Sequence, residues 1–147
     1  MINNPENLII LSCSARKKEG AGLIPAIERY DGPAYRVVKS RLPLNNVRFV
    51  ILSAQYGLID AQQPIPDYNL KMTLSRAIEL GQCPRQQQAL LSALNTGQVF
   101  VFGGKLYRQA IVAMAQGKNL DTCTWQWSHG GLGYQLQQLA SFLDSLP

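Results

Sequence analysis

Short apolar runs bounded by polar residues recur along the chain and predict buried β-strands. Within these runs the apolar residues are continuous rather than alternating, which is typical of strands that are covered on both faces. The runs span residues 7–13, 47–53, 98–102 and 121–127. We therefore expect a mainly parallel sheet of about four strands.

The segments between these runs carry helical signals. Pro33 follows an Asp-Gly pair and stands at the first position of a predicted helix over residues 33–42. The last helix has the clearest signal, since one apolar stripe runs through Leu132, Leu136, Leu139 and Leu143. Further helices are predicted over residues 74–80, 85–94 and 105–115, and Pro84 makes the first two either separate helices or one broken helix.

Strands that alternate with helices imply right-handed crossovers within one sheet. The sequence thus predicts an α/β fold, a single-domain, Rossmann-like three-layer sandwich over residues 1–147. Composition agrees, because 46% hydrophobic and 16% charged residues are ordinary for a folded protein and too apolar for a disordered one.

Cysteine and histidine usage argues against a metal site. Cys13, Cys83 and Cys123 are widely spaced, without the Cys-x-x-Cys pattern, and His129 is the single histidine. We expect buried or idle thiols and no metal or other cofactor. The apolar run at residues 8–11 is too short for a membrane span or a signal peptide, so we expect a cytoplasmic protein without a membrane partner. The sequence makes no prediction about oligomeric state.

Positive charge is concentrated in the first third of the chain. The net charge is +5, and residues 1–48 hold eight basic groups against four acidic ones. The basic groups are Arg16, Lys17, Lys18, Arg29, Arg36, Lys39, Arg41 and Arg48. This distribution predicts an anionic partner, with a merely solvated surface as the alternative.

Three polar turns follow predicted strands, at the sheet edge where open α/β folds bind their ligands. In the first turn, Ser12, Ser14 and Lys17 offer hydroxyl groups, nearby backbone amides and a cation to a phosphate. A solvated basic loop is the alternative. The turn lacks the glycine spacing of a P-loop or of a dinucleotide fingerprint.

The second turn follows the strand at residues 47–53. Ser53 and Tyr56 can donate hydrogen bonds and Gly57 permits a tight turn or close ligand approach, although Tyr56 also suits ordinary packing. The stiff segment that follows carries Asp67 and Tyr68 toward the same crevice. Asp67 is the leading candidate for an acid, a base or a ribose-binding group, with capping of the next turn as the alternative.

The third turn contains Gly104, Lys105 and Tyr107 at the start of a predicted helix. Unpaired amides and the helix dipole favour an anion there, and a cation at Lys105 is unfavourable unless it faces a negative ligand. We interpret Trp125 and Trp127 as core residues rather than base-stacking platforms. His129 lies in a Gly-rich turn, which is typical of a structural or exposed histidine.

These segments together resemble a known family. The matching segments are Leu-Ser-Cys-Ser-Ala-Arg-Lys-Lys at 11–18, Tyr-Asp-Gly-Pro at 30–33, Ile-Leu-Ser-Ala-Gln-Tyr-Gly-Leu-Ile at 51–59, Pro-Asp-Tyr at 66–68 and Gly-Gly-Lys-Leu-Tyr at 103–107. The pattern resembles a small prokaryotic family of unknown function that is distantly similar to the YaaA peroxide-stress proteins. The resemblance covers nearly the whole chain, which is nevertheless much shorter than a YaaA protein.

The resemblance implies DNA binding in the oxidative stress response, and wider relatives imply action on nucleobases or N-glycosidic bonds. Fold or family kinship alone does not fix function. The family's apparent site positions correspond to Ser12, Ser14, Lys17, Tyr30, Ser53, Tyr56, Gly57, Asp67, Tyr68, Gly104, Lys105 and Tyr107.

Three functions remain open from the sequence. The first is an enzyme that acts on a nucleotide or nucleic acid and cleaves or exchanges an N-glycosidic bond, with Asp67 and Tyr68 as catalytic residues. The second is a non-catalytic DNA- or nucleotide-binding module in the stress response, whose affinity would fall with salt. The third is a small-molecule or protein-interaction domain whose polar turns only satisfy strand ends.

Overall fold

The central strand, β1 (Asn7–Ser12), organises the sheet. The computed structural model describes residues 7–94, 97–118 and 123–146. In it β1 pairs in parallel with β3 (Val47–Ser53) on one side and with β6 (Gln98–Phe102) on the other. Successive residues of β1 point to opposite faces, so Leu8 and Ile9 enter different core clusters. Both faces of the strand are buried, which explains its continuous apolar sequence.

Two further strands complete the five-stranded sheet, whose order is β4-β3-β1-β6-β7. At one edge β7 (Thr124–Trp127) runs parallel to β6, and residues 121–122 of the predicted fourth strand lie outside the described ranges. At the other edge β4 (Gly57–Asp60) runs antiparallel to β3 and is the strand that the sequence did not predict. A separate two-stranded sheet joins β2 (Ile24–Pro25) to β5 (Pro64–Ile65).

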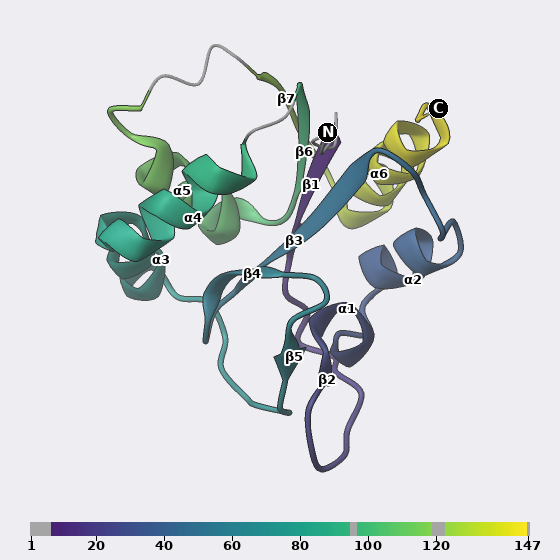
Figure 1. Cartoon of the computed structure of the whole chain (residues 1–147), viewed down its shortest axis with the longest axis horizontal. Coiled ribbons are helices and arrows are strands. Elements are labelled where there is room, and N and C mark those ends of the chain that lie inside the picture. The colour runs from purple at the N-terminus through teal and green to yellow at the C-terminus, as the bar shows by residue number, and fades with distance from the viewer. Residues whose placement is uncertain (1–6, 95–96, 119–122, 147) are drawn as a thin grey trace, which may run out of the picture.

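Helices cover both faces of the large sheet (Figure 1). On one face lie α3 (Leu74–Gln82), α4 (Pro84–Ala93) and α5 (Lys105–Ala115). The other face is covered by α2 (Pro33–Lys39) and α6 (Leu132–Asp144). The predicted three-layer α/β sandwich with a mainly parallel sheet is therefore confirmed.

The helix boundaries follow local chemistry. Pro84 stands at the first position of α4, so the segment forms two helices rather than one broken helix. The helix that begins at Pro33 ends at Lys39, three residues earlier than expected. In α6 the predicted stripe is buried at Leu139 and Leu143, whereas Leu132 is 57% exposed. The short helix α1 (Ala26–Arg29) was not predicted.

None of the helices within the described ranges is long and apolar enough to cross a membrane.

Candidate functional site

The loop after β1 is held at both ends above the carboxyl edge of the sheet. The amide of Cys13 donates to the carbonyl of Leu52 at 2.9 Å, which extends the pairing with β3 by one residue. The hydroxyl of Ser14 then donates to the carbonyl of Arg16 at 2.5 Å and closes a local turn. Lys17 pairs with Tyr30 in an isolated antiparallel bridge, so its position is fixed by the backbone.

This backbone pairing places the ammonium group of Lys17 over two aromatic rings. Its Nζ lies 4.5 Å from the ring centroid of Tyr68 and 5.9 Å from that of Tyr30. A cation over an aromatic face is attracted by the ring quadrupole, and the rings therefore hold Lys17 without neutralising its charge.

Beneath Lys17, hydroxyl groups of three residues form a hydrogen-bonded chain. The hydroxyl of Tyr68 contacts that of Tyr30 and lies 2.8 Å from Oγ of Ser53. Ser53 is fully buried, and its Oγ accepts hydrogen bonds from the amides of Gln55 and Tyr56, each at 3.1 Å. The end of β3 therefore fixes Tyr68, and Tyr68 in turn supports Lys17.

Burial keeps the tyrosines of this region in the neutral form. Desolvation raises the pKa of Tyr30 to about 12, although hydrogen bonds from Ser53 and Tyr68 favour its ionised form. Burial likewise raises the pKa of Tyr68, Tyr107 and Tyr35 above the ordinary value. At neutral pH these hydroxyl groups therefore remain protonated and can donate hydrogen bonds.

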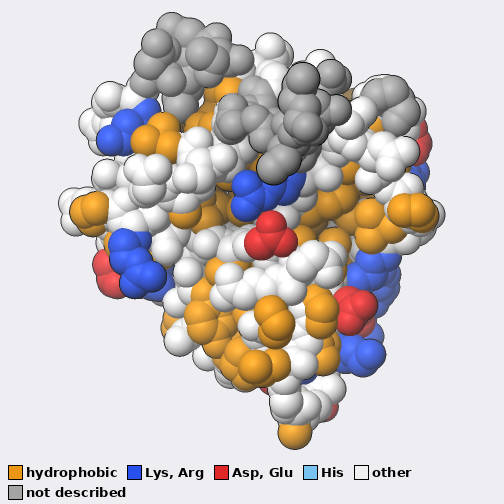
Figure 2. Space-filling view, viewed as in Figure 1, with side chains coloured by type: hydrophobic (Ala, Val, Ile, Leu, Met, Phe, Trp, Pro, Cys, Tyr) orange, Lys and Arg blue, Asp and Glu red, His pale blue; other side chains and the backbone are white. Residues whose placement is uncertain are grey.

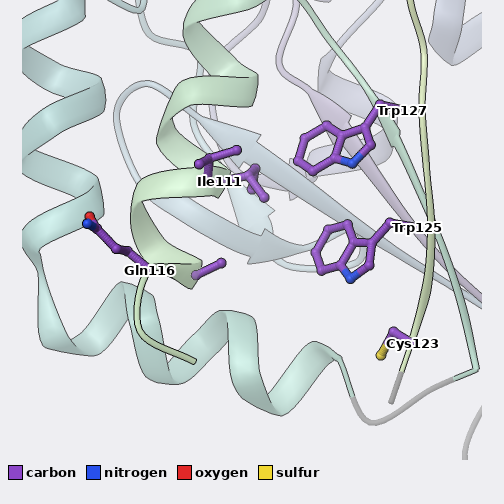
Figure 3. A pocket seen from close by; sticks show the side chains of 7 residues that line it. Ile111, Gln116, Cys123, Trp125 and Trp127 are labelled. Carbon is purple, nitrogen blue, oxygen red and sulfur yellow. The ribbon is translucent and has the colours of Figure 1, made fainter. Parts of the chain in front are cut away.

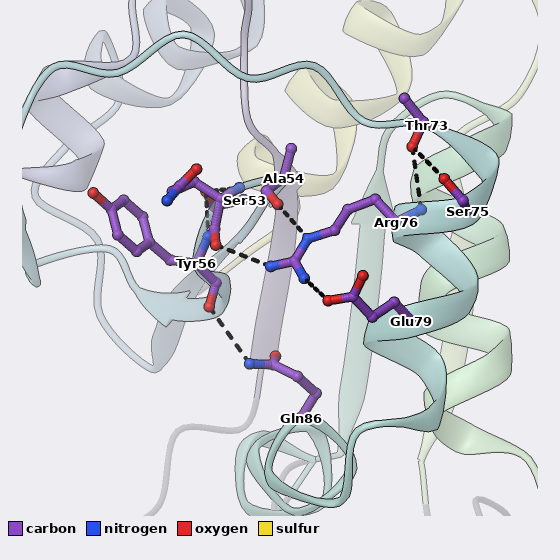
Figure 4. A network of polar contacts seen from close by, with 9 residues as sticks. Ser53, Ala54, Tyr56, Thr73, Ser75, Arg76, Glu79 and Gln86 are labelled. Carbon is purple, nitrogen blue, oxygen red and sulfur yellow. Dashed lines mark hydrogen bonds and ion pairs between the residues drawn. The ribbon is translucent and has the colours of Figure 1, made fainter.

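The turn between β3 and β4 is tied to the helices on one face (Figure 4). Arg76 of α3 donates from Nε to the carbonyl of Ala54 at 2.7 Å and forms an ion pair with Glu79 at 2.6 Å. Gln86 of α4 accepts a hydrogen bond from the amide of Leu58 at 2.8 Å. These contacts hold the turn that carries Ser53 and Tyr56.

Gly57 is required by this arrangement. Its φ is +75°, a conformation that favours glycine, and a Cβ there would collide with the side-chain amide of Gln86. The side chain of Gln86 therefore fills the space beside Gly57, and the glycine is needed for the conformation of the turn rather than for ligand approach.

A cavity of about 320 Å³ opens beside the β1 loop. Lys17 and Cys13 belong to its lining, and Sγ of Cys13 lies 3.1 Å from the hydroxyl oxygen of Tyr107. The polar residues around the cavity are Cys13, Ser14, Lys17, Asn69, Lys71 and Tyr107. Two lysines among neutral hydroxyl and amide groups form an electropositive hollow.

A second hollow of about 500 Å³ adjoins the first. It is lined by Arg16, Glu19, Asp67 and Tyr68, and it shares Ala15, Lys17 and Asn69 with the first cavity. Asp67 is exposed and therefore solvated in this hollow.

The structure brings together most, but not all, of the site residues predicted from sequence. Ser14, Lys17 and Tyr107 line one cavity, Asp67 and Tyr68 line the adjoining one, and Ser53 and Tyr56 lie below them.

Three other predicted site residues lie apart from this pair of cavities. Ser12 lies beside a small hollow of about 160 Å³, and its carbonyl accepts a hydrogen bond from Tyr35 at 2.8 Å. Gly104 is exposed with open space around its Cα. Lys105 lines a different hollow next to Trp127.

Four residues of the site were not predicted from their own chemistry. Cys13 follows a strand directly, but its thiol was assigned as idle, and Tyr30 entered only through the family resemblance. Asn69 and Lys71 lie in an irregular segment that has neither periodicity nor a motif.

One basic group of the first third of the chain does not lie on the surface. Arg29, counted among the basic groups of the first third, is only 1% exposed. Its guanidinium donates to the carbonyls of Lys18, Gly22 and Ile65 at 2.7, 2.9 and 3.3 Å. It ties loops together and is unavailable to an anionic partner. In the described part of the chain, no group of three or more His, Cys, Asp or Glu residues is placed to hold a metal ion.

Comparison with known proteins identifies a family. The model of a family of unknown function, DUF6884, matches residues 8–141. The chain belongs to this family. The site of this DUF6884 member, from Cys13 to Tyr107, lies within the matched region. No curated protein matches the sequence.

One solved structure is similar to nearly the whole length of this DUF6884 protein. It is the crystal structure of AF0587, a protein of unknown function, with 14% sequence identity and a TM-score of 0.49. The similarity covers 97% of this chain and 46% of the other, so the chain spans less than half the length of that protein.

Proposed function

We propose that this protein is an enzyme that binds a nucleotide, free or within a nucleic acid, at the carboxyl edge of its sheet and cleaves or exchanges the N-glycosidic bond. The observation that carries the proposal is the pair of adjoining hollows that meet at Lys17. One is lined by two lysines and no carboxylate, and the other is lined by the carboxylates of Asp67 and Glu19 together with Arg16. Phosphate recognition and glycosidic chemistry need these two environments side by side.

The phosphate is assigned to the first cavity. Lys17 and Lys71 supply positive charge, and Asn69 supplies a hydrogen-bond donor. A volume of about 320 Å³ falls at the lower end of the range of small-molecule sites, so this cavity accommodates part of a nucleotide. The remainder extends past Lys17 into the second hollow.

The reaction is assigned to Asp67. The C1′–N bond breaks, the base leaves with the bonding electron pair and takes up a proton, and the oxygen of a water molecule bonds to C1′. The carboxylate of Asp67 stabilises the positive charge that develops on the sugar and accepts the proton of that water. Tyr68 acts as a positioning residue, because its ring holds Lys17 at the junction of the two hollows.

The distribution of charge favours this localised site over an extended DNA-binding surface. Asp31 lies 3.5 Å from the guanidinium groups of both Arg16 and Arg36, Arg41 pairs with Asp144, and Arg48 pairs with Asp60. On the face shown in Figure 2, Lys and Arg side chains stand in small separate groups, several of them beside an acidic side chain. The resemblance to YaaA proteins supports the DNA-binding alternative, but phosphate contacts along a duplex need unpaired cations over a broad surface.

The test has two stages, and each has a matched control. Nucleoside monophosphates and short oligonucleotides are first screened for thermal stabilisation, with Lys17→Gln expected to weaken binding at least tenfold. Lys18→Gln is the control, because Lys18 is an exposed lysine beside it that lines neither hollow.

The second stage measures release of free base by chromatography. Asp67→Asn should lower the rate at least a hundredfold with little change in binding, whereas the exposed Glu28→Gln of α1 should retain full activity. Full turnover by Asp67→Asn would refute the catalytic assignment. Binding that responds equally to Lys17→Gln and Lys18→Gln would refute the phosphate site.

A further inference from the structure

A further hollow lies on the face of the sheet that α3, α4 and α5 cover, between α5 and the edge strand β7. It has a volume of about 830 Å³ and is mainly apolar, with Ile111, Val112 and Ala115 on the helix side and Trp125 and Trp127 on the strand side. Figure 3 shows both indole rings reaching from β7 toward α5. The rings are nearly parallel, with an interplanar angle of 11° and centroids 5.4 Å apart. The two stacked rings form the aromatic wall of the hollow, and both also pack, partly buried, against the core cluster on this face of the sheet.

One end of this groove is cationic. An adjoining hollow of about 510 Å³ shares Val112, Gln116 and Trp127 with the first and is also lined by Lys105 and Arg108. These helix residues follow one another at spacings of three, four and four, so they lie on one face of α5. The groove therefore runs from two cations at the first turn of the helix to the aromatic wall.

No described residue that lines the two hollows supplies an acidic counterpart to this charge. Lys105 is exposed at the N-terminal turn of α5, where the helix dipole disfavours a cation. An anion bound there would interact favourably with the lysine, with Arg108 and with the free amides of the helix.

The aromatic end contains an unpaired donor. Nε1 of Trp125 is buried and has no hydrogen-bond partner within the described structure. Leaving such a donor unpaired costs about 1–3 kcal/mol. Gln116 at the edge of the groove adds an amide that can donate or accept.

We propose that the α5–β7 groove binds a heteroaromatic anion, a flat ring with hydrogen-bond acceptors that carries one phosphate or carboxylate. The ring lies against Trp125 and Trp127, and the anionic group lies between Lys105 and Arg108. This site is separate from the hollows that meet at Lys17, and it does not depend on the proposed reaction.

Intrinsic fluorescence tests the proposal directly, because the chain has two tryptophans and both line the groove. AMP, adenosine and inorganic phosphate are titrated while tryptophan emission is recorded. AMP should change the emission at concentrations at least fivefold lower than adenosine does. Lys105→Gln should remove this difference, whereas Lys118→Gln, an exposed lysine beyond α5, should keep it.

Three outcomes would contradict the proposed binding site in the groove. Equal responses to AMP and adenosine in the native protein would exclude the anion end, and no response to either would exclude the ring site. A response to AMP that disappears in Lys17→Gln would place the ligand in the other site and also overturn the proposal. Base release is scored separately, so its failure counts only against the proposed enzyme activity.

Discussion

Two regions of this protein bury polar atoms of large side chains and use them differently. Around Arg29, both terminal guanidinium nitrogens donate to loop carbonyls, although Nε has no partner. In the α5–β7 groove, the indole nitrogen of Trp125 is buried without a partner among the described residues. Both regions thus contain one buried nitrogen without a described partner, but only Arg29 also forms hydrogen bonds that tie separate segments of the chain together. The difference separates a residue that holds the fold together from one that packs beside a groove.

Replacement of the buried guanidinium should have the largest effect on stability. Arg29→Met keeps much of the volume but leaves the carbonyls of Lys18, Gly22 and Ile65 without their charged donor. Because hydrogen bonds to charged groups contribute about 1.5–3 kcal/mol each, and relief of the buried charge offsets part of this, we expect a loss of about 3 kcal/mol. Urea denaturation measures it. The exposed Arg36→Met should lose less than about 1 kcal/mol, and equal losses would contradict the structural role.

Alkaline pH should have the second-largest effect on stability, through the buried tyrosines around Tyr30. The pKa of Tyr30 is raised to about 12 in the folded protein, against an ordinary value near 10 in the unfolded chain. The unfolded state therefore releases this proton first, and the free energy of unfolding should fall between pH 10 and 12 by at most about 1.4 kcal/mol per pH unit from this group. Denaturation curves recorded from pH 8 to 12 measure the slope. An equally steep decline in Tyr30→Phe would assign the effect to other groups.

The features that follow from local sequence were predictable, and those that depend on distant contacts were not. The strands β1, β3 and β6 were predicted because each is a continuous apolar run, whereas β4 was missed because Gly57 indicated a turn. The burial of Arg29 depends on carbonyls as far along the chain as Ile65. No local pattern specifies those partners.

The same limit applies to the site. Lys17 was predicted because its turn directly follows a strand. Lys105 also follows a strand, but the rotation of α5 directs Tyr107 toward the β1 cavity and Lys105 toward the groove. A helix places neighbouring residues on different faces, and the sequence alone did not indicate which face meets the site.

A smaller loss of stability is expected when one hydroxyl group is removed from the hydrogen-bonded chain of Tyr30, Tyr68 and Ser53. Tyr68→Phe removes the hydroxyl that joins Tyr30 to Ser53 and leaves two buried hydroxyl groups with one partner fewer. We expect a loss of about 2 kcal/mol in the free energy of unfolding. Thermal and urea denaturation measure it, with Tyr134→Phe on the exposed face of α6 as the neutral control. A neutral Tyr68→Phe would show that the hydroxyl chain contributes nothing.

The matched change in the groove should have the smallest effect. Trp125→Phe removes a donor that has no partner, so only packing at a half-buried position is lost. We expect less than about 1 kcal/mol of destabilisation, together with weaker AMP binding. The combination of denaturation and fluorescence from the remaining Trp127 separates the two effects. A loss as large as that of Tyr68→Phe would remove the distinction between the two regions.

The position of β1 also has a consequence for biosynthesis. The strand made first is the centre of the finished sheet, and Asn7 stands opposite Val47 and Gln98, which leave the ribosome much later. Such non-local pairing slows folding. The apolar stretch Leu8–Leu11 therefore has no partner on one side until β6 has been translated, and a product interrupted before β6 would leave that edge of the strand open to aggregation.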